Sequence, residues 1–219
     1  MAVVLLEHEG REVLNHYGIK NVPGEFCPSK AEMIAAAKRI GYPVVLKVVS
    51  HQVIHKSEVG GVKVNIPDQT SLENAYTEML LSVREHVPDA HIEGVLVTKF
   101  INGAKEVIVG ALHDSQFGAV IMTGLGGIFV EVFKDVSFAV APIDMKEAQH
   151  MIKSLKSYPI LTGVRGDAPV NLEALQSLLV KVSEYVSKEN VLELDLNPVF
   201  CIGDEVLIGD VRILLKEDA

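Results

Sequence analysis

The stretch from Lys47 to Lys63, KVVSHQVIHKSEVGGVK, constrains the fold more than any other part of the chain. It contains an apolar β-run with a lysine, a polar loop with a histidine and a Gly-Gly pair, and a returning β-run. Glycines let backbone amides approach a phosphate because they carry no Cβ, and a lysine supplies positive charge. The stretch is not a Walker A loop, since G-x-x-x-x-G-K-[ST] is absent and no helix follows it. It therefore predicts a strand–loop–strand unit suited to binding phosphates.

Composition favours a globular protein with an enzyme-like core. The chain has 219 residues, of which 48% are hydrophobic and 22% charged. Its net charge of −9 disfavours nucleic acids and anionic membranes as partners, but it leaves room for a local basic pocket that binds a nucleotide. Cys27 and Cys201 lack the spacing of a metal site or a disulfide framework, which indicates a reducing compartment. No membrane-spanning run or signal peptide is evident, so we expect a soluble, cytoplasmic protein.

Hydrophobic periodicity predicts a helix–strand–loop–strand–helix segment over about residues 19–95. The capping box Ser29-x-x-Glu32 opens the helix before the strand VVLKVV, and Thr70-x-x-Glu73 opens the helix after the strand VKVNI. A lysine inside a buried strand costs stability unless a charge or a ligand satisfies it. We expect this segment to form a compact α+β lobe.

The remainder of the chain is rich in predicted strands. Asn102-Gly103 separates GVLVTKFI from EVIVGALH and predicts a β-hairpin between them. The glycine cluster Gly124–Gly127 is a weak signal by itself. Helices are expected to begin at Asp144 and near Asn171, and the runs VLELDLNPVF and EVLIGDVRIL are expected to close the chain as a β-pair.

The final β-pair carries candidate magnesium ligands. Glu193, Asp195 and Asn197 alternate with leucines, so they lie on one face of a strand, and Asp210 is on the partner strand. Oxygen ligands without clustered Cys and His suit Mg²⁺, which usually keeps waters and substrate phosphates as its other ligands. The alternative is a solvated strand face, although facing acidic residues would repel each other without a cation.

Four further residues have open alternatives. Lys47 could be a core lysine that extends its amine to the surface, but the glycine loop and the acidic pair favour a phosphate contact. Glu106 could accept hydrogen bonds from ribose hydroxyls or end a strand. His55 could be a solvated side chain or a nucleophile that carries a phosphoryl group, since neutral imidazole is nucleophilic near neutral pH. Arg165 could bind an anion or form a surface ion pair.

Several blocks, in one order, resemble a known family. They are HKSEVGGVKV, EGVLVTKFINGAKEVIVG, QFGAVIMTGLGGIFVEVFKDVSFAVAP, GVRGDAPV and LELDLNPV. Over about residues 5–213 the chain resembles the ATP-grasp β component of ADP-forming acyl-CoA synthetases such as acetyl-CoA synthetase. It is more distantly similar to the β subunit of succinyl-CoA synthetase. The resemblance implies a single α+β ATP-grasp module over residues 1–219, with two lobes that clamp a nucleotide. Residues 19–95 would form the smaller lid lobe, and residues 1–18 and 96–219 the larger lobe.

The resemblance also implies a reaction and a partner. Acyl-CoA, ADP and phosphate would convert reversibly to the free acid, ATP and CoA, by way of an acyl phosphate and a phosphohistidine. An α subunit would bind CoA and carry the principal histidine, so the isolated chain would lack complete activity and would work in a hetero-oligomer, a heterotetramer in this family. Two alternatives remain: the ATP-grasp part of another carboxylate-activating ligase, and a regulatory nucleotide-binding module without turnover.

Position by position, the resemblance implies roles in binding and catalysis. Lys47 would contact the phosphates of ATP or ADP, and Gly60 and Gly61 would form the lid loop over them. His55 would relay the phosphoryl group, and Asp195 or Glu193 would orient it by hydrogen bonding.

The remaining implied roles concern the nucleoside and the metal. Glu106 would bind ribose, and Asn197 and Asp210 would bind Mg²⁺. A hinge over residues 97–101 would receive adenine through its backbone, with Val97, Lys99, Phe100 and Ile101 as the residues concerned. Lys99 stands where ATP-grasp hinges commonly have an acidic residue, so the purine contacts and the base preference are left open.

Overall fold

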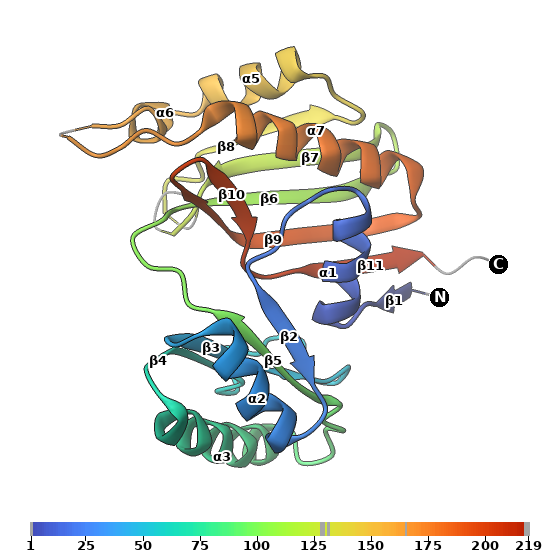
Figure 1. Cartoon of the computed structure of the whole chain (residues 1–219). Coiled ribbons are helices and arrows are strands. Elements are labelled where there is room, and N and C mark those ends of the chain that lie inside the picture. The colour runs from blue at the N-terminus through green and yellow to red at the C-terminus, as the bar shows by residue number, and fades with distance from the viewer. Residues whose placement is uncertain (1, 128–129, 131, 165, 217–219) are drawn as a thin grey trace. The chain divides into compact units, whose positions relative to one another are not determined.

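The computed structural model describes residues 2–127, 130, 132–164 and 166–216, and the chain forms two compact units (Figure 1). The small unit is continuous and spans Val22–Asn102, and the large unit combines Met1–Asn21 with Gly103–Ala219. None of the helices over the described residues combines the length and the hydrophobicity of a membrane span.

The small unit is a four-stranded antiparallel sheet with two helices. Its strands lie in the order β2 (Gly24–Cys27), β5 (Gly94–Lys99), β3 (Val44–Val49) and β4 (Val62–Ile66). Helices α2 (Lys30–Ile40) and α3 (Gln69–His86) pack against the sheet. Alternate residues of the two central strands enter the core with these helices, as the two-residue period of a strand requires: Val44, Leu46, Val48, Val95 and Val97. The predicted order of helix, strand, loop, strand and helix is found in α2, β3, β4 and α3, but the segment also contains β2, which was not predicted.

The boundary of the small unit lies beyond β5. This strand pairs with β2 on one side and with β3 on the other, so its residues belong to the small unit. The boundary expected from the sequence, at residues 95 and 96, falls inside the strand, whereas the compact unit ends at Asn102.

The prediction of a β-hairpin at Asn102-Gly103 is wrong. The strand before it, β5, belongs to the four-stranded sheet, and the strand after it, β6 (Lys105–Asp114), belongs to a different, seven-stranded sheet. Gly103 does take a left-handed conformation, with φ of 73°. The pair therefore turns the chain as Asn-Gly usually does, but it connects the two units instead of two paired strands.

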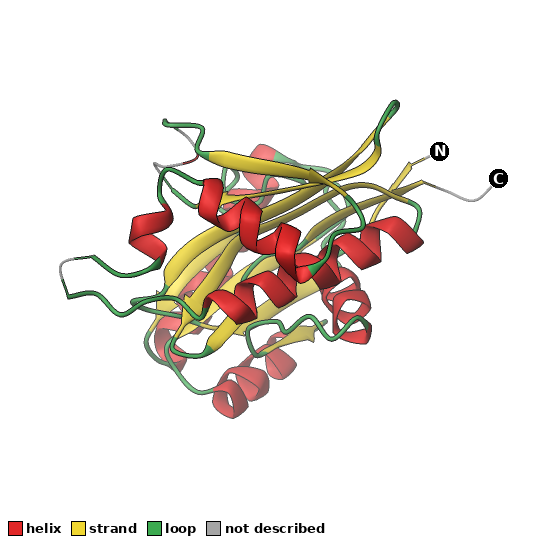
Figure 2. Ribbon diagram, turned by 90° about the horizontal axis from the view of Figure 1, so that it is seen from above, coloured by secondary structure: helices red, strands yellow, loops and turns green. Residues whose placement is uncertain are grey.

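The large unit is built on a seven-stranded antiparallel sheet. Six strands follow the order β1 (Ala2–Val4), β11 (Arg212–Lys216), β9 (Val191–Ile202), β6, β7 (Gly118–Leu125) and β8 (Val136–Val140), and β10 (Glu205–Ile208) also pairs with β9. Its helices in the described residues are α1 (Glu7–His16), α5 (Met145–Ser154), α6 (Tyr158–Leu161) and α7 (Leu172–Lys188). Figure 2 shows the elements of both units by type. The predicted closing β-pair is confirmed, because β9 pairs with both β10 and β11.

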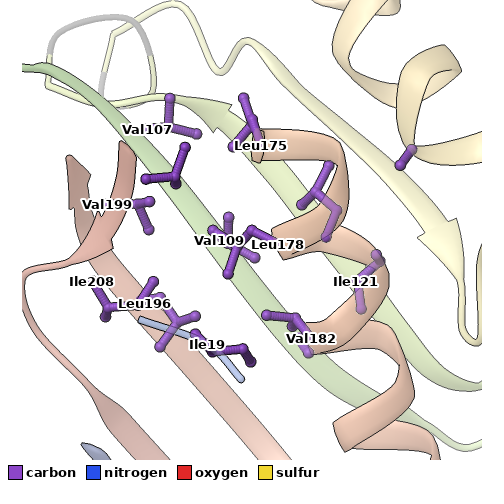
Figure 3. Packing of buried hydrophobic residues seen from close by; sticks show 14 of the residues in the cluster. Ile19, Val107, Val109, Ile121, Leu175, Leu178, Val182, Leu196, Val199 and Ile208 are labelled. Atoms are coloured by element: carbon purple, nitrogen blue, oxygen red, sulfur yellow. The ribbon is translucent and has the colours of Figure 1, made fainter. Parts of the chain in front are cut away.

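The core of the large unit lies between α7 and the sheet. Figure 3 shows Leu175, Leu178 and Val182 of the helix directed at side chains of β6 and β9, among them Val109 and Leu196. These strand residues alternate with residues that point to the opposite face of the sheet. That opposite face carries most of the polar residues predicted to be functional in this unit.

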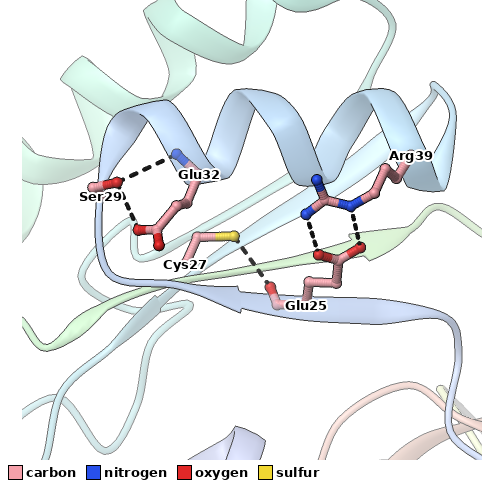
Figure 4. Close-up of polar contacts among 5 residues, drawn as sticks. All are labelled: Glu25, Cys27, Ser29, Glu32 and Arg39. Carbon is pink, nitrogen blue, oxygen red and sulfur yellow. Dashed lines mark hydrogen bonds and ion pairs between the residues drawn. The ribbon is translucent and has the colours of Figure 1, made fainter.

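Most of the predicted side-chain caps lie at the residues that the sequence indicates. The Ser29 hydroxyl oxygen accepts a hydrogen bond from Glu32 N at 3.3 Å, and the hydroxyl donates to the Glu32 carboxylate at 2.6 Å (Figure 4). Asp144 and Asn171 cap α5 and α7 as predicted.

The cap of α3 differs from the prediction. Its N-cap is Asp68, whose Oδ1 accepts from Ser71 N at 2.8 Å, and not Thr70. The helix begins immediately after the strand and Pro67, so Thr70 already lies inside its first turn. Glu73 is consequently not a capping partner and forms an ion pair with Lys30 at 2.9 Å.

Candidate functional site

Lys47 lies on the face of the small sheet opposite its core. Its neighbours along β3, Leu46 and Val48, belong to the hydrophobic core. Because side chains alternate between the two faces of a strand, Lys47 points to the opposite face. Its cross-strand partners are Leu96 on β5 and Val62 on β4. The lysine is only 6% exposed, in a strand that is otherwise apolar. Placing an ammonium group there is unfavourable unless charged or polar groups meet it.

The loop between β3 and β4 is closed by its own backbone hydrogen bonds. Gly61 N donates to Lys56 O at 2.7 Å, and Gly60 N donates to Ser57 O at 3.3 Å. Gly61 O accepts from Val48 N at 2.8 Å, which fastens the end of the loop to β3. The amides of both glycines are therefore already engaged, and a phosphate could use them only after the loop rearranges.

Packing explains why both positions are glycine. Gly60 has φ of 68°, and a Cβ there would lie 2.5 Å from the hydroxyl oxygen of Ser82 on α3. A Cβ on Gly61 would lie 2.6 Å from Val48 Cγ1 and 2.9 Å from Lys56 O. These contacts are too short for a side chain, so the Gly-Gly pair is needed for the loop conformation itself.

His55 is an exposed residue of the same loop. Its carbonyl accepts from Glu58 N at 3.2 Å, and its side chain is open to solvent. Two residues earlier, Val53 is 4% exposed and joins the hydrophobic core of the small unit. The loop is thus anchored by an apolar side chain, while the imidazole stays accessible to a reacting group.

The predicted adenine hinge is largely committed to the small sheet. Val97 lies in the central strand β5, paired with Glu25 on one side and Leu46 on the other, and its side chain is fully buried. Lys99 N donates to Pro23 O at 2.8 Å, and Phe100 N donates to Pro43 O at 3.2 Å. The backbone N–H groups of Lys99 and Phe100 therefore already have acceptors within the small unit, so neither is open to a base.

The side chain of Lys99 is tied to the end of α2. Its amine donates to Gly41 O at 2.8 Å and to Tyr42 O at 3.1 Å. Gly41 is the C-cap of this helix, and a cation there interacts favourably with the negative end of the helix dipole. Lys99 thus has a structural partner at the position where ATP-grasp hinges commonly carry an acid.

Glu106 lies at the start of β6 in the large unit, opposite Phe200 of β9, and its side chain is exposed. The glycine cluster Gly124–Gly127, unassigned from the sequence, lies directly beside it. Gly126 N donates to Glu106 O at 2.8 Å, and a Cβ on Gly126 would be 3.2 Å from Glu106 Cβ. The cluster thus gives the chain the room to pass close to Glu106.

The acidic face of β9 is arranged as predicted. Asp195 and Asn197 are exposed and Glu193 is half-buried, whereas Leu194 and Leu196 between them are buried.

Asp210 lies in the segment between β10 and β11, beside β9. Ile208 pairs with Val199 and Arg212 pairs with Asp195, so the register brings Asp210 opposite Asn197.

The donor set of Asn197 and Asp210 fits Mg²⁺. Among the described residues, no three or more His, Cys, Asp or Glu side chains gather as a metal site. Mg²⁺ does not need such a cage, because it is commonly held by one or two protein oxygens together with waters and phosphates. An amide oxygen and a carboxylate at facing positions supply that minimal set.

Two arginines near these acids were missed from the sequence. Arg11 of α1 is 6% exposed and forms an ion pair with Glu7 at 3.9 Å. Burial lowers the pKa of Arg11, and the negative charges of Glu7 and Asp210 oppose that effect. The i,i+4 spacing of Glu7 and Arg11 indicates a pair, but only the fold brings it near Asp210.

Arg212 is the second missed residue. Its Nη1 lies 2.7 Å from Glu193 Oε1, and its Cα is paired in register with Asp195. The pKa of the Asp195 carboxyl is raised, chiefly by burial. The charge of Arg212 opposes this shift, and the charge of Glu193 adds to it. In the sequence, Arg212 is only a basic residue two positions after Asp210. Its partners can be identified only once the register of β9 and β11 is known. Arg165 lies outside the described residues.

Comparisons with known proteins identify the family of the chain. The sequence model of the ATP-grasp domain family matches residues 2–215. The chain is 44% identical over 212 residues to the β subunit of acetate–CoA ligase (ADP-forming) I of Pyrococcus furiosus, covering 96% of this chain and 91% of that one. It is 47% identical to acetate–CoA ligase (ADP-forming) I of Archaeoglobus fulgidus, but it covers only 31% of that longer protein.

A solved structure is similar over nearly the whole chain. It is the dinucleotide-forming acetyl-coenzyme A synthetase 1 of Ca. Korarchaeum cryptofilum, with a TM-score of 0.94, 44% identity and coverage of 97% of this chain and 93% of that one. In another structure of that protein, with coenzyme A and Mg-AMPPCP, a phosphohistidine segment points towards the nucleotide binding site, and the TM-score is 0.84. The chain therefore belongs to the ATP-grasp family, among the β subunits of ADP-forming acetate–CoA ligases.

Proposed function

We propose that this chain is the nucleotide-binding β subunit of an ADP-forming acyl-CoA synthetase. With an α partner it would convert acyl-CoA, ADP and phosphate to the free acid, ATP and CoA. The observation that carries the proposal is the match along nearly the full length of a dedicated β subunit. The relative in which this sequence is about a third of a longer ligase supports the need for a partner, because the remaining functions lie outside the matching part.

The residue roles follow from charge and position. Lys47 would neutralise phosphate charge, which also accounts for a lysine in an apolar strand. Glu106 would accept hydrogen bonds from the ribose hydroxyls, and the backbone at Phe100 and Ile101 would meet the base. Val97 and Lys99 would support this segment through the sheet and the end of α2, because their polar groups already have partners there.

The loop that carries Gly60 and Gly61 would act as a lid over the phosphates. Since the amides of both glycines donate within the loop, closure over a nucleotide would exchange these hydrogen bonds for bonds to phosphate oxygens. Such lid movements commonly exclude water from a reaction, which would protect a phosphohistidine from hydrolysis.

Asn197 and Asp210 would hold Mg²⁺. When bound, the ion would supply positive charge to the nucleotide phosphates. The two side chains would fix its position relative to β9 and β10, and the nucleotide would complete its ligands.

His55 would relay the phosphoryl group in two displacements. In the first, a nitrogen of its neutral imidazole forms the N–P bond as the N–P bond to the histidine of the α subunit breaks. In the second, a β-phosphate oxygen of ADP forms the new P–O bond as the N–P bond to His55 breaks, which gives ATP. Asp195 or Glu193 would orient a histidine by accepting its ring N–H.

The test is reconstitution with the cognate α subunit. Mixed subunits should form ATP from acetyl-CoA or another acyl-CoA, ADP and phosphate, and the chain alone should not. A Lys47→Met variant is expected to lose activity, whereas Lys63→Met on the neighbouring strand should keep it. Nucleotide binding without turnover after addition of the α subunit would contradict the proposal and would indicate a regulatory module. Complete activity of the chain alone would contradict the need for a partner.

The buried cysteines support one further expectation. Cys27 and Cys201 are both unpaired and buried in the hydrophobic cores, which suits a reducing compartment such as the cytoplasm. Localisation of a tagged protein would test this expectation.

A further inference from the structure

Three charged side chains share one region of the large sheet. Glu193 and Asp195 point to the same face of β9, and Arg212 on the adjacent strand β11 is paired in register with Asp195. Arg212 Nη1 contacts Glu193 Oε1 at 2.7 Å, so its guanidinium reaches diagonally to Glu193. Both side chains of the pair keep contact with solvent, with 36% of Arg212 and 44% of Glu193 exposed.

This pairing changes the charge that the strand face presents. Without Arg212, Glu193 and Asp195 would place two negative charges beside Asn197. A phosphohistidine that approaches this face is also negative, so it would be repelled. The ion pair cancels one of the two acids and leaves Asp195 as the acidic side chain that an incoming histidine can use.

The hydrogen bonding of Arg212 indicates more than a structural clamp. Its Nε atom is buried and has no hydrogen-bond partner among the residues that the structure describes. A buried donor without a partner is unfavourable, and an arginine selected only for stability would be expected to satisfy it.

We propose that Arg212 is a positioning residue for phosphoryl transfer, which holds Glu193 in an ion pair so that Asp195 alone meets the phosphohistidine. This inference rests on the function proposed above. It assigns to Arg212 a role that acts through the charge of its neighbour and not through contact with the nucleotide.

The measurement is the transfer of phosphate from the phosphorylated α subunit to ADP, at varied concentrations of the α subunit. Arg212→Met should raise the concentration needed for half-maximal rate by about tenfold, because the uncompensated Glu193 repels the phosphorylated segment. The dissociation constant of ADP for the chain alone, from calorimetry, should change by less than about threefold, since ADP does not use Glu193.

A second variant and a change of salt concentration separate charge from structure. Arg212→Lys keeps the positive charge and should stay within about threefold of the wild type. The deficit of Arg212→Met relative to the wild type should shrink from about tenfold at low salt to about threefold at roughly 0.5 M salt, because screening weakens the repulsion by Glu193. A purely structural role for the arginine would leave the deficit independent of salt.

Arg39→Met is the matched control. Arg39 Nε lies 3.1 Å from Glu25 Oε1 in an exposed ion pair of the small unit (Figure 4). Loss of this pair should leave phosphate transfer unchanged. Circular dichroism and thermal melting would establish that each variant is folded, and if Arg212→Met is not, Arg212→Gln, which also removes the charge, takes its place.

The inference is overturned if Arg212→Met behaves as the wild type, or if its deficit is as large at high salt as at low salt. Either result, with a wild-type complex that transfers phosphate, contradicts the role of Arg212 alone. A wild-type complex without any transfer contradicts the proposed function, and this inference with it.

Discussion

The role of His55 depends on where the fold places its side chain. In the sequence it is one of eight histidines, and spacing alone leaves a solvated side chain as a full alternative. The structure places it on an exposed loop anchored by Val53. An accessible imidazole on an anchored loop suits a relay, because the ring must meet two reaction partners in turn.

We expect His55→Ala to abolish the transfer of phosphate from the α subunit to ADP while ADP binding survives. The reason is that the side chain is lost as a nucleophile, whereas the lysine and the acidic face remain. Rapid quenching with labelled phosphate would measure the transfer, and calorimetry the binding. His51→Ala, in the same loop and also exposed, is the matched control and should transfer normally. Normal transfer by His55→Ala would exclude the relay.

The facing residues Asn197 and Asp210 lead to a prediction on metal removal. In the wild type, chelation of Mg²⁺ should weaken ATP binding. In the variant Asn197→Ala with Asp210→Ala, ATP binding should be weak with or without Mg²⁺, because both protein oxygens are lost. Titrations in Mg²⁺ and in EDTA would compare the two proteins. If Mg²⁺ strengthened ATP binding by the variant as much as it strengthens binding by the wild type, these residues would be excluded as ligands.

At the residue scale, the sequence found the side chains whose position in a strand is unusual. Lys47 stands out in VVLKVV, and the acids of LELDLNPVF stand out by their alternation. Arg11 and Arg212 could not be found in this way, because their partners are set by helix packing and strand register. Likewise, the sequence indicates that the amides of Gly60 and Gly61 are candidates for binding phosphate. It does not reveal that both amides already donate hydrogen bonds within the loop.

At the scale of elements, the start of α3 offers a test of the corrected cap. Asp68→Ala should lower the urea midpoint of unfolding, because Ser71 N loses its acceptor. Thr70→Ala should change it much less, since Thr70 does not cap the helix. Equal effects of the two changes would contradict the cap seen in the structure.

Asp135 connects the segment before β8 to the start of α6. Its carboxylate accepts from Lys156 N at 2.9 Å and from Ser157 N at 2.7 Å, and the residue is 7% exposed. Burial alone would raise the pKa of Asp135, but the hydrogen bonds from Ser157 and Lys156 outweigh it and lower the pKa. The ionised form is therefore the one that stabilises this part of the fold.

The lowered pKa gives a pH dependence with a definite sign. Its contribution to stability is present above the pKa of an unfolded aspartate, about 3.9, and is lost as the pH falls through the lower folded-state value. Asp135→Asn should cost about 1–2 kcal/mol near neutral pH, and the difference from the wild type should shrink below about pH 4. Urea unfolding at pH 7, 5 and 3 would measure it. A difference independent of pH would show that the charge does not contribute.

Elements were predictable where the signal is local. The strand VVLKVV and the caps at Ser29, Asp144 and Asn171 all rest on neighbouring residues. The hairpin at Asn102-Gly103 failed because the turn signal is local but the choice of sheet is not. The same Asn-Gly conformation serves a hairpin or a connection between units, and only long-range pairing decides.

At the scale of the whole molecule, each unit has its own core, and each core contains one cysteine. Burial raises the pKa of the Cys27 thiol to about 11 and that of the Cys201 thiol to about 12. Because the thiolate is the reactive form, neither residue should react appreciably with a thiol reagent at pH 8 in the folded protein.

The two thiols therefore report separately on the opening of the two units. In increasing urea at pH 8, labelling of Cys27 should follow the small unit and labelling of Cys201 the large unit. The double variant with both cysteines replaced by alanine controls for other reactions. Mass spectrometry of peptides would give the two rates. Fast labelling of either residue without denaturant would contradict its burial.

The order of strands in the large sheet has a consequence for synthesis. The strand β1, at Ala2–Val4, pairs with β11, at Arg212–Lys216, and the whole small unit lies between them in the chain. On the ribosome, the small unit can fold once residues 22–102 have emerged, because all its strand partners lie within that segment. The large unit must wait for its last strand to be made, so during most of translation the first residues of the chain have no sheet to join.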